Sequence, residues 1–161
     1  MNNTLIVYAS RHGTTSEYAK QLFQLLNGNV DLCFLNERGD SLPDLSVYTT
    51  IVIGGSIHYG KNSISVLKFT NDNMELLKTK RLGLFVPCHF EGDKALQQLN
   101  NAYPKELIDR AIVTDYFEGE LLFPKMNAWE KFITKLVLRK DEIKPIVSKD
   151  RIIRFAEKLQ S

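Results

Sequence analysis

The stretch Leu5-Ile-Val-Tyr-Ala-Ser-Arg-His-Gly-Thr-Thr15 runs from apolar residues into small and hydroxyl-bearing ones. Residues 5–9 have the β-branched and aromatic content of a strand that is buried on both faces, as in a parallel sheet. Behind them come the hydroxyl groups of Ser10, Thr14 and Thr15. The stretch therefore predicts a buried strand that ends in a polar turn.

The turn leads into a helix. Gly13 allows a backbone conformation that is closed to other residues, and residues 16–26 place apolar side chains at a helical spacing. A helix N-terminus exposes unpaired N–H groups and the positive end of its dipole, so the turn predicts a phosphate site. The alternative is that the serine and threonines only cap the helix. Neither G-x-x-x-x-G-K-[ST] nor G-x-G-x-x-G occurs, which favours a single phosphate monoester over a nucleoside triphosphate or a dinucleotide.

Composition limits the remaining possibilities. With 161 residues, 43% of them hydrophobic, we expect one domain over residues 1–161. The apolar runs are only strand-sized, and the first strand starts too early to leave room for a signal peptide. Cys33 and Cys88 are too few for a disulfide framework, which favours a reducing cytoplasm. The first 124 residues carry a net charge of −3 and the others a net charge of +5.

Strand-like and helix-like patterns alternate along the chain, which predicts a parallel sheet with helices on both faces. We expect strands at 5–9, 30–35, 49–54, 82–87 and 110–117, and helices at 16–26, 63–77 (with a break at 70–73), 94–102 and 147–160. Five strands suit the order 2-1-3-4-5, in which ligands bind beyond the carboxyl ends, at the switch between the first and third strands. Residues 10–15, 55–61 and 87–93 should therefore meet at one crevice.

These features resemble the flavodoxins over most of the chain, which implies a flavodoxin-like three-layer sandwich that binds FMN. The family's [ST]-x-[ST]-G-x-T phosphate loop is matched at residues 10–15, with His12 in place of the middle hydroxyl. A closer likeness is to the menaquinone-dependent protoporphyrinogen oxidases and their flavodoxin-domain relatives. They share the [ST]-R-x-G-x-T loop and an I-G-x-S-I-x-Y-G segment, here residues 53–60, and residues 123–139 are similar as well.

The resemblance implies that the phosphate is held by Ser10, Thr15 and the backbone amides of residues 11–14. The full set of expected cofactor-binding residues is Ser10, Arg11, His12, Gly13, Thr14, Thr15, Ser56, Ile57, His58, Tyr59, Gly60, Pro87, Cys88, His89, Phe90 and Asp93. Tyr59 and Phe90 are the candidates to flank the flavin ring, and Cys88 is expected to be a small lining residue. No catalytic residue is assigned.

All three histidines, His12, His58 and His89, fall in the three loops beside Cys88. Their spacing matches no recognised zinc pattern, and a flavin would fill the same space, so no metal is expected. One or two of these histidines would instead adjoin the flavin ring or its phosphate, where a protonatable imidazole influences the charge on reduced flavin. The alternative is that they are ordinary polar loop residues.

Residues 124–140 form a basic amphipathic segment before the last helix. Such a helix lies on an anionic membrane, as the oxidase resemblance also implies, or packs on its own domain or on a second subunit. We favour packing, which includes a homodimer if the helix packs on a second subunit, and peripheral contact at the inner face of the membrane stays the alternative.

The predicted function is an FMN-binding oxidoreductase or electron-transfer protein. Electron-shuttling flavodoxins are strongly acidic, whereas this chain has a net charge of only +2. We therefore expect a small-molecule partner, such as a quinone or a tetrapyrrole, and no nucleic acid. One alternative is a menaquinone-dependent protoporphyrinogen oxidase-like enzyme. Another is a non-catalytic phosphate-binding module, suggested by His12 and by the lack of tryptophan in the ring loops.

Overall fold

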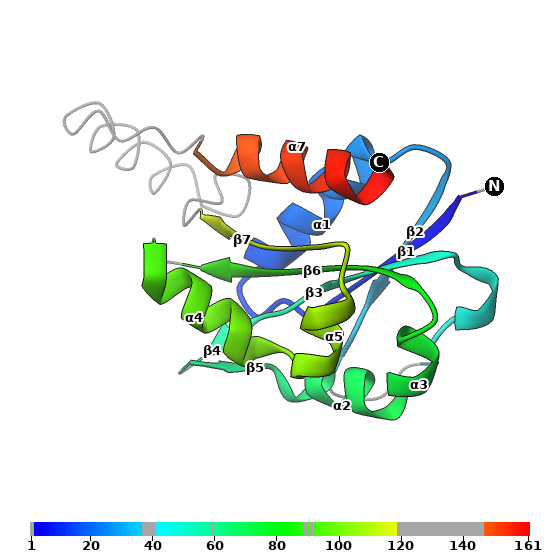
Figure 1. Ribbon diagram of the computed structural model, residues 1–161, viewed down its shortest axis with the longest axis horizontal. Helices are drawn as coiled ribbons and strands as arrows, with labels where there is room; N and C mark the ends of the chain where they lie inside the picture. The colour runs from blue at the N-terminus through cyan, green and yellow to red at the C-terminus, as the bar shows by residue number, and fades with distance from the viewer. Residues whose placement is uncertain (1, 37–40, 59, 89, 91, 119–146) are drawn as a thin grey trace.

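The fold is a three-layer α/β sandwich around one parallel sheet (Figure 1). The computed structural model describes residues 2–36, 41–58, 60–88, 90, 92–118 and 147–161. The strands of the sheet lie in the order β2-β1-β3-β6-β7. Their bounds are Asn3–Tyr8 (β1), Asn29–Phe34 (β2), Thr50–Gly54 (β3), Arg81–Cys88 (β6) and Val113–Glu118 (β7). The predicted order, with the first strand between the second and third, is confirmed.

Helices cover both faces of the sheet (Figure 1). On one face lie α1 (Thr14–Leu25) and α7 (Val147–Gln160), and on the other α2 (Ile64–Asp72), α3 (Met74–Leu77), α4 (Gly92–Ala102) and α5 (Lys105–Arg110). The buried strand residues divide between two cores in the alternating way that a strand requires. Leu5 and Val7 face the α2–α5 side, whereas Ile6 and Tyr8 face α1 and α7.

The last strand and the second loop differ from the sequence-based expectations. The last strand begins at Val113 rather than at residue 110, because the residues before it form α5, which buries Leu107. The second loop contains a small antiparallel hairpin, β4 (Ile57–His58) and β5 (Lys61–Asn62). A short 3-10 helix, η1 (Leu45–Val47), follows the second strand. The predicted break between residues 70 and 73 is confirmed by the boundary between α2 and α3.

Pro87 does not end its strand, contrary to expectation. The strand β6 continues to Cys88 by pairing with β7, whereas its pairing with β3 stops at Phe85. Among the described residues, no pairing of β6 with β3 extends beyond Phe85. A proline, which has no N–H to donate, is tolerated at such an edge.

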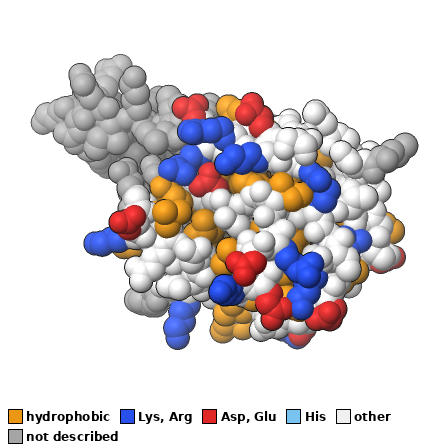
Figure 2. Space-filling view, viewed as in Figure 1, with side chains coloured by type: hydrophobic (Ala, Val, Ile, Leu, Met, Phe, Trp, Pro, Cys, Tyr) orange, Lys and Arg blue, Asp and Glu red, His pale blue; other side chains and the backbone are white. Residues whose placement is uncertain are grey.

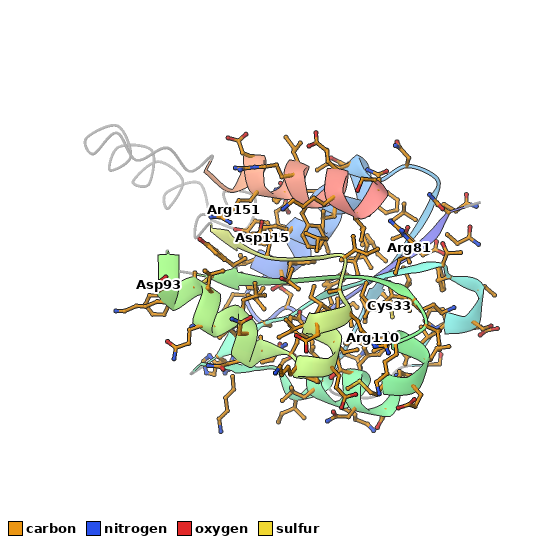
Figure 3. The ribbon with its side chains drawn as sticks, viewed as in Figure 1. Cys33, Arg81, Asp93, Arg110, Asp115 and Arg151 are labelled. Atoms are coloured by element: carbon orange, nitrogen blue, oxygen red, sulfur yellow. The ribbon has the colours of Figure 1, made fainter. Side chains whose placement is uncertain are left out.

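An ion pair joins the last strand to the last helix. Arg151 of α7 lies 2.8 Å from an Asp115 carboxylate oxygen of β7 and 2.8 Å from the Tyr116 hydroxyl (Figure 3). The contact therefore fixes the start of α7 against the sheet. The predicted amphipathic segment, residues 124–140, lies outside the described residues. None of the described helices is long and apolar enough to cross a membrane.

Candidate functional site

The carboxyl ends of β1, β3 and β6 open into a cavity of about 420 Å³. Residues from all three predicted loops line it: Ser10, Arg11, His12, Thr14, Thr15, Ser56, Ile57, His58, Gly60, Pro87 and Phe90, together with Gln98 of α4. The parallel topology thus brings together segments that are far apart in the sequence, as predicted. Tyr59 and His89 lie outside the described residues.

The turn between β1 and α1 presents unsatisfied donors to this cavity. Gly13, at the N-cap of α1, has a φ of 89°, a conformation that L side chains rarely adopt. No described side chain forms a capping hydrogen bond there, so the interpretation of the serine and threonines as helix caps is wrong. The Oγ of Ser10 is buried and has no hydrogen-bond partner among the described residues. A buried hydroxyl without a partner is costly, so this arrangement favours an external acceptor.

Thr15 connects the first loop to the second. Its Oγ1 donates a hydrogen bond of 2.9 Å to the Gly55 carbonyl, and its side chain is buried. The Ala9 amide donates to the neighbouring Gly54 carbonyl at 3.1 Å. The hydroxyl proton of Thr15 therefore holds the two loops together, whereas that of Ser10 is committed to no described group.

Asn62 fixes the shape of the second loop from inside. Its Oδ1 accepts from the amides of Ser56 at 3.0 Å and Ser63 at 2.9 Å. Its Nδ2 donates to the Ala102 carbonyl at the end of α4, at 2.9 Å. One buried amide thus satisfies three backbone groups and joins the loop to α4. Sequence reasoning missed this residue, because an asparagine in a polar loop carries no signal of burial.

Tyr103 joins β3 to β6 beneath the cavity. Its hydroxyl lies 2.6 Å from the Phe85 carbonyl oxygen and 3.0 Å from that of Ile53. Burial raises the pKa of Tyr103, so the phenol stays protonated and remains a donor. The Gly55 amide also donates to the Phe85 carbonyl, at 2.9 Å. The point where the second loop leaves the sheet is therefore held by several buried hydrogen bonds.

Cys88 supports the third loop, and it is not among the described residues that line the cavity, contrary to expectation. The Sγ of Cys88 is 3.1 Å from Gln98 Oε1 and accepts from the Phe90 amide at 3.4 Å. Phe90 lines the cavity and is 46% exposed, which leaves its ring accessible to a ligand. Gln98 was not predicted, because a glutamine within a helix carries no signal that it lies at the cavity.

Asp93 is exposed in the first turn of α4 (Figure 3) and is not among the described cavity-lining residues. A carboxylate at a helix N-terminus is favoured by the helix dipole.

His12 and His58 both line the cavity. Within the described ranges, no three His, Cys, Asp or Glu side chains gather as a metal site would require.

The strand that leads into the second loop tolerates no side chain at Gly54. A Cβ built there would lie 2.4 Å from Cζ of Phe85, whose ring stacks on Phe117 at 4.9 Å. We expect Gly54→Ala to lower the free energy of unfolding by about 1–3 kcal/mol, the usual range for overpacking. Urea denaturation measures this. Phe85→Leu, combined with Gly54→Ala, should remove part of the penalty, and strict additivity of the two changes would contradict the contact.

Several solved structures share the fold. A flavodoxin, WrbA-like protein from Agrobacterium tumefaciens aligns with a TM-score of 0.61 at 16% identity, covering 99% of this chain and 98% of its own. Oxidised Flavodoxin 1 from Bacillus cereus aligns with a TM-score of 0.59 at 17% identity, covering 99% and 97%. A flavoprotein in complex with FMN from Lactobacillus acidophilus aligns with a TM-score of 0.51 at 15% identity, covering 72% and 93%.

Sequence identities as low as these establish only that the structures share the fold. No curated protein matches the sequence. The sequence pattern of the Flavodoxin domain, however, matches residues 5–146, which include all three loops of the cavity. The chain therefore belongs to the flavodoxin family.

Proposed function

We propose that the cavity binds FMN and that the protein uses it for redox chemistry. The observation that carries this proposal is the buried Ser10 hydroxyl without a described partner, next to the uncapped N-terminus of α1 at Gly13. Both supply hydrogen-bond donors, and a phosphate monoester supplies the acceptor oxygens and the negative charge that the helix dipole favours. The site thus fits the phosphate end of FMN.

The other side of the cavity suits a flat aromatic ring. Ile57, Pro87 and Phe90 supply apolar surface, and Gln98 supplies a polar group from α4. Phe90 can stack on a ring, which contributes about 0.5–1.5 kcal/mol beyond burial of area. FMN, when bound, supplies the electron-transfer chemistry, while these residues orient the ring and exclude water from it. The structural neighbour that contains FMN supports the same ligand.

Reconstitution tests the proposal directly. Purified protein stripped of small molecules should quench the fluorescence of added FMN at a ratio of one to one. If riboflavin, which lacks the phosphate, bound as tightly as FMN, the proposal that this turn binds the phosphate would be contradicted. Binding of other phosphorylated ligands without FMN would support the non-catalytic phosphate-binding module instead.

Arg11 provides a milder test of the same site. Its side chain is exposed at the cavity, and backbone amides would carry most of the phosphate recognition. We expect Arg11→Ala to weaken FMN binding by only about 3-fold, the scale of an exposed charge pair. Fluorescence titration at low salt measures this. Arg154→Ala removes another exposed arginine, on α7, and should leave the affinity unchanged. A loss of 100-fold for Arg11→Ala would mean that the side chain dominates.

We propose further that the electron partner is a small molecule. The net charge of +2 lacks the strong negative field that speeds encounters with basic redox proteins. The match of residues 53–60 to the I-G-x-S-I-x-Y-G segment favours, as a second candidate, a menaquinone-dependent protoporphyrinogen oxidase-like activity. Protein reduced anaerobically should be reoxidised rapidly by a menaquinone analogue. Turnover of protoporphyrinogen would support the oxidase, whereas salt-sensitive reoxidation by a protein partner alone would contradict both candidates.

A further inference from the structure

A second, apolar groove lies between the end of β2 and the helix α2. We call it the α2 groove; it has a volume of about 440 Å³, and Phe34, Leu35, Leu42, Ile64, Phe69 and Lys68 are among its lining residues. Two of the apolar side chains are unusually open to solvent, Ile64 at 80% and Phe34 at 48%. In Figure 2, hydrophobic side chains reach the lower edge of the molecule where Figure 1 draws β5 and α2.

The exposure of Ile64 does not arise from a frayed helix end. Ser63 caps α2 by accepting a hydrogen bond from the Val66 amide at 3.4 Å, and the Ser63 amide is itself held by Asn62. The backbone at Ile64 is therefore held in the first turn of α2. Covering such a residue with another apolar group gains free energy without any ordering of the helix.

The α2 groove continues toward the phosphate turn through a larger cavity of about 820 Å³. Phe34 and Ile64 line both hollows, while Ser10 and Arg11 line the larger cavity and the FMN cavity. The α2 groove and the larger cavity differ in whether their positive side chains have an acidic partner. In the α2 groove, Lys68 is paired with Asp72 at 2.7 Å.

The larger cavity has an uncompensated positive lining. Arg11 and Lys61 contribute to it, and none of its described lining residues is acidic. Arg11 lies beside the proposed phosphate position, which leaves Lys61, on the β4–β5 hairpin, as the other cation of the larger cavity. An apolar groove with a positive charge beyond one end is complementary to an anionic amphiphile.

We propose that the α2 groove binds a small anionic amphiphile, with its apolar body against Phe34 and Ile64 and its carboxylate toward Lys61. The α2 groove shares no described lining residue with the FMN cavity, and the proposal goes beyond the proposed redox function. A naphthalene ring that carries one carboxylate is a probe with this chemistry. Neutral apolar molecules should bind more weakly, because they gain nothing from Lys61.

Two ligands of the same shape test the proposal. We would titrate the full chain, with and without saturating FMN, with 2-naphthoate and with its uncharged counterpart 2-naphthamide, and follow the backbone amides by NMR. We expect 2-naphthoate to shift the amides of Phe34, Ile64 and Ser65 and to bind about 3-fold more tightly than 2-naphthamide. Binding of 2-naphthoate in the groove should be seen whether or not FMN binds, whereas the assignment of its carboxylate to Lys61 rests on the proposed function, in which the phosphate occupies Arg11.

Variants locate the binding. Ile64→Asn should weaken 2-naphthoate binding by about 10-fold. In the FMN-bound protein, Lys61→Gln should abolish the preference for 2-naphthoate over 2-naphthamide. Ile153→Asn, which changes an isoleucine of α7 that is 41% exposed, is the matched control and should change neither. Unchanged binding to Ile64→Asn, equal affinity for both ligands, or displacement of 2-naphthoate by FMN would each overturn the proposal. Circular dichroism confirms that each variant is folded.

Discussion

Replacing Gly13 with valine is expected to lower the affinity for FMN by about 100-fold, the largest loss from any single change in the phosphate turn. Gly13 has a φ of 89°, which a β-branched residue adopts only at a cost of about 1–3 kcal/mol. The turn would relax away from this conformation and move the first amides of α1. The side chain would also crowd the phosphate next to Ser10. Fluorescence titration with FMN measures the loss.

Gly28 supplies a matched control for backbone strain. Its φ is 86°, and a Cβ there would lie 2.7 Å from the Asn2 carbonyl oxygen, at the opposite end of the first helix. Gly28→Val should therefore destabilise the fold at least as much as Gly13→Val while leaving FMN affinity unchanged in the folded protein. Equal losses of FMN affinity in the two variants would mean that strain acts globally and that Gly13 has no specific role.

The sequence predicts well those features that depend on the pattern of neighbouring residues. Residues 5–9 are apolar throughout because both faces of β1 are buried. The glycine at position 13 has the positive φ that its place before a helix indicated. Since carboxyl ends of parallel strands meet at one edge, three polar loops were enough to predict the cavity.

The features that it could not predict depend on contacts between distant segments. The Thr15 hydroxyl donates to Gly55, forty positions away, and nothing in the threonine itself distinguishes this bond from a phosphate contact. Gln98 of α4 lies at the cavity beside Cys88 of β6, and no local pattern indicates this contact. The helix α5 has six residues and buries Leu107, too short a pattern to be recognised by period.

Asn62 is the strongest example of such a contact, and its removal should be the most damaging change outside the apolar core. Asn62→Leu leaves the amides of Ser56 and Ser63 and the carbonyl of Ala102 without their partner. Each buried unsatisfied group costs about 1–3 kcal/mol, and two of the three are only partly buried, so we expect a loss of about 3 kcal/mol in the free energy of unfolding. Urea denaturation measures it.

The same change should also reveal whether the second loop is built for the ligand. With Asn62→Leu, the amides of Ser56 and Ser63 should exchange hydrogen faster than the rest of the protein, because Oδ1 no longer accepts from them. Ser56 lines the FMN cavity, so FMN affinity should fall together with this protection. Asn100→Leu, at an exposed position of α4, is the control and should alter neither. Loss of stability with intact FMN affinity would show that Asn62 supports the fold alone. Loss of both would show that one buried amide fixes the loop in the shape that the cofactor requires.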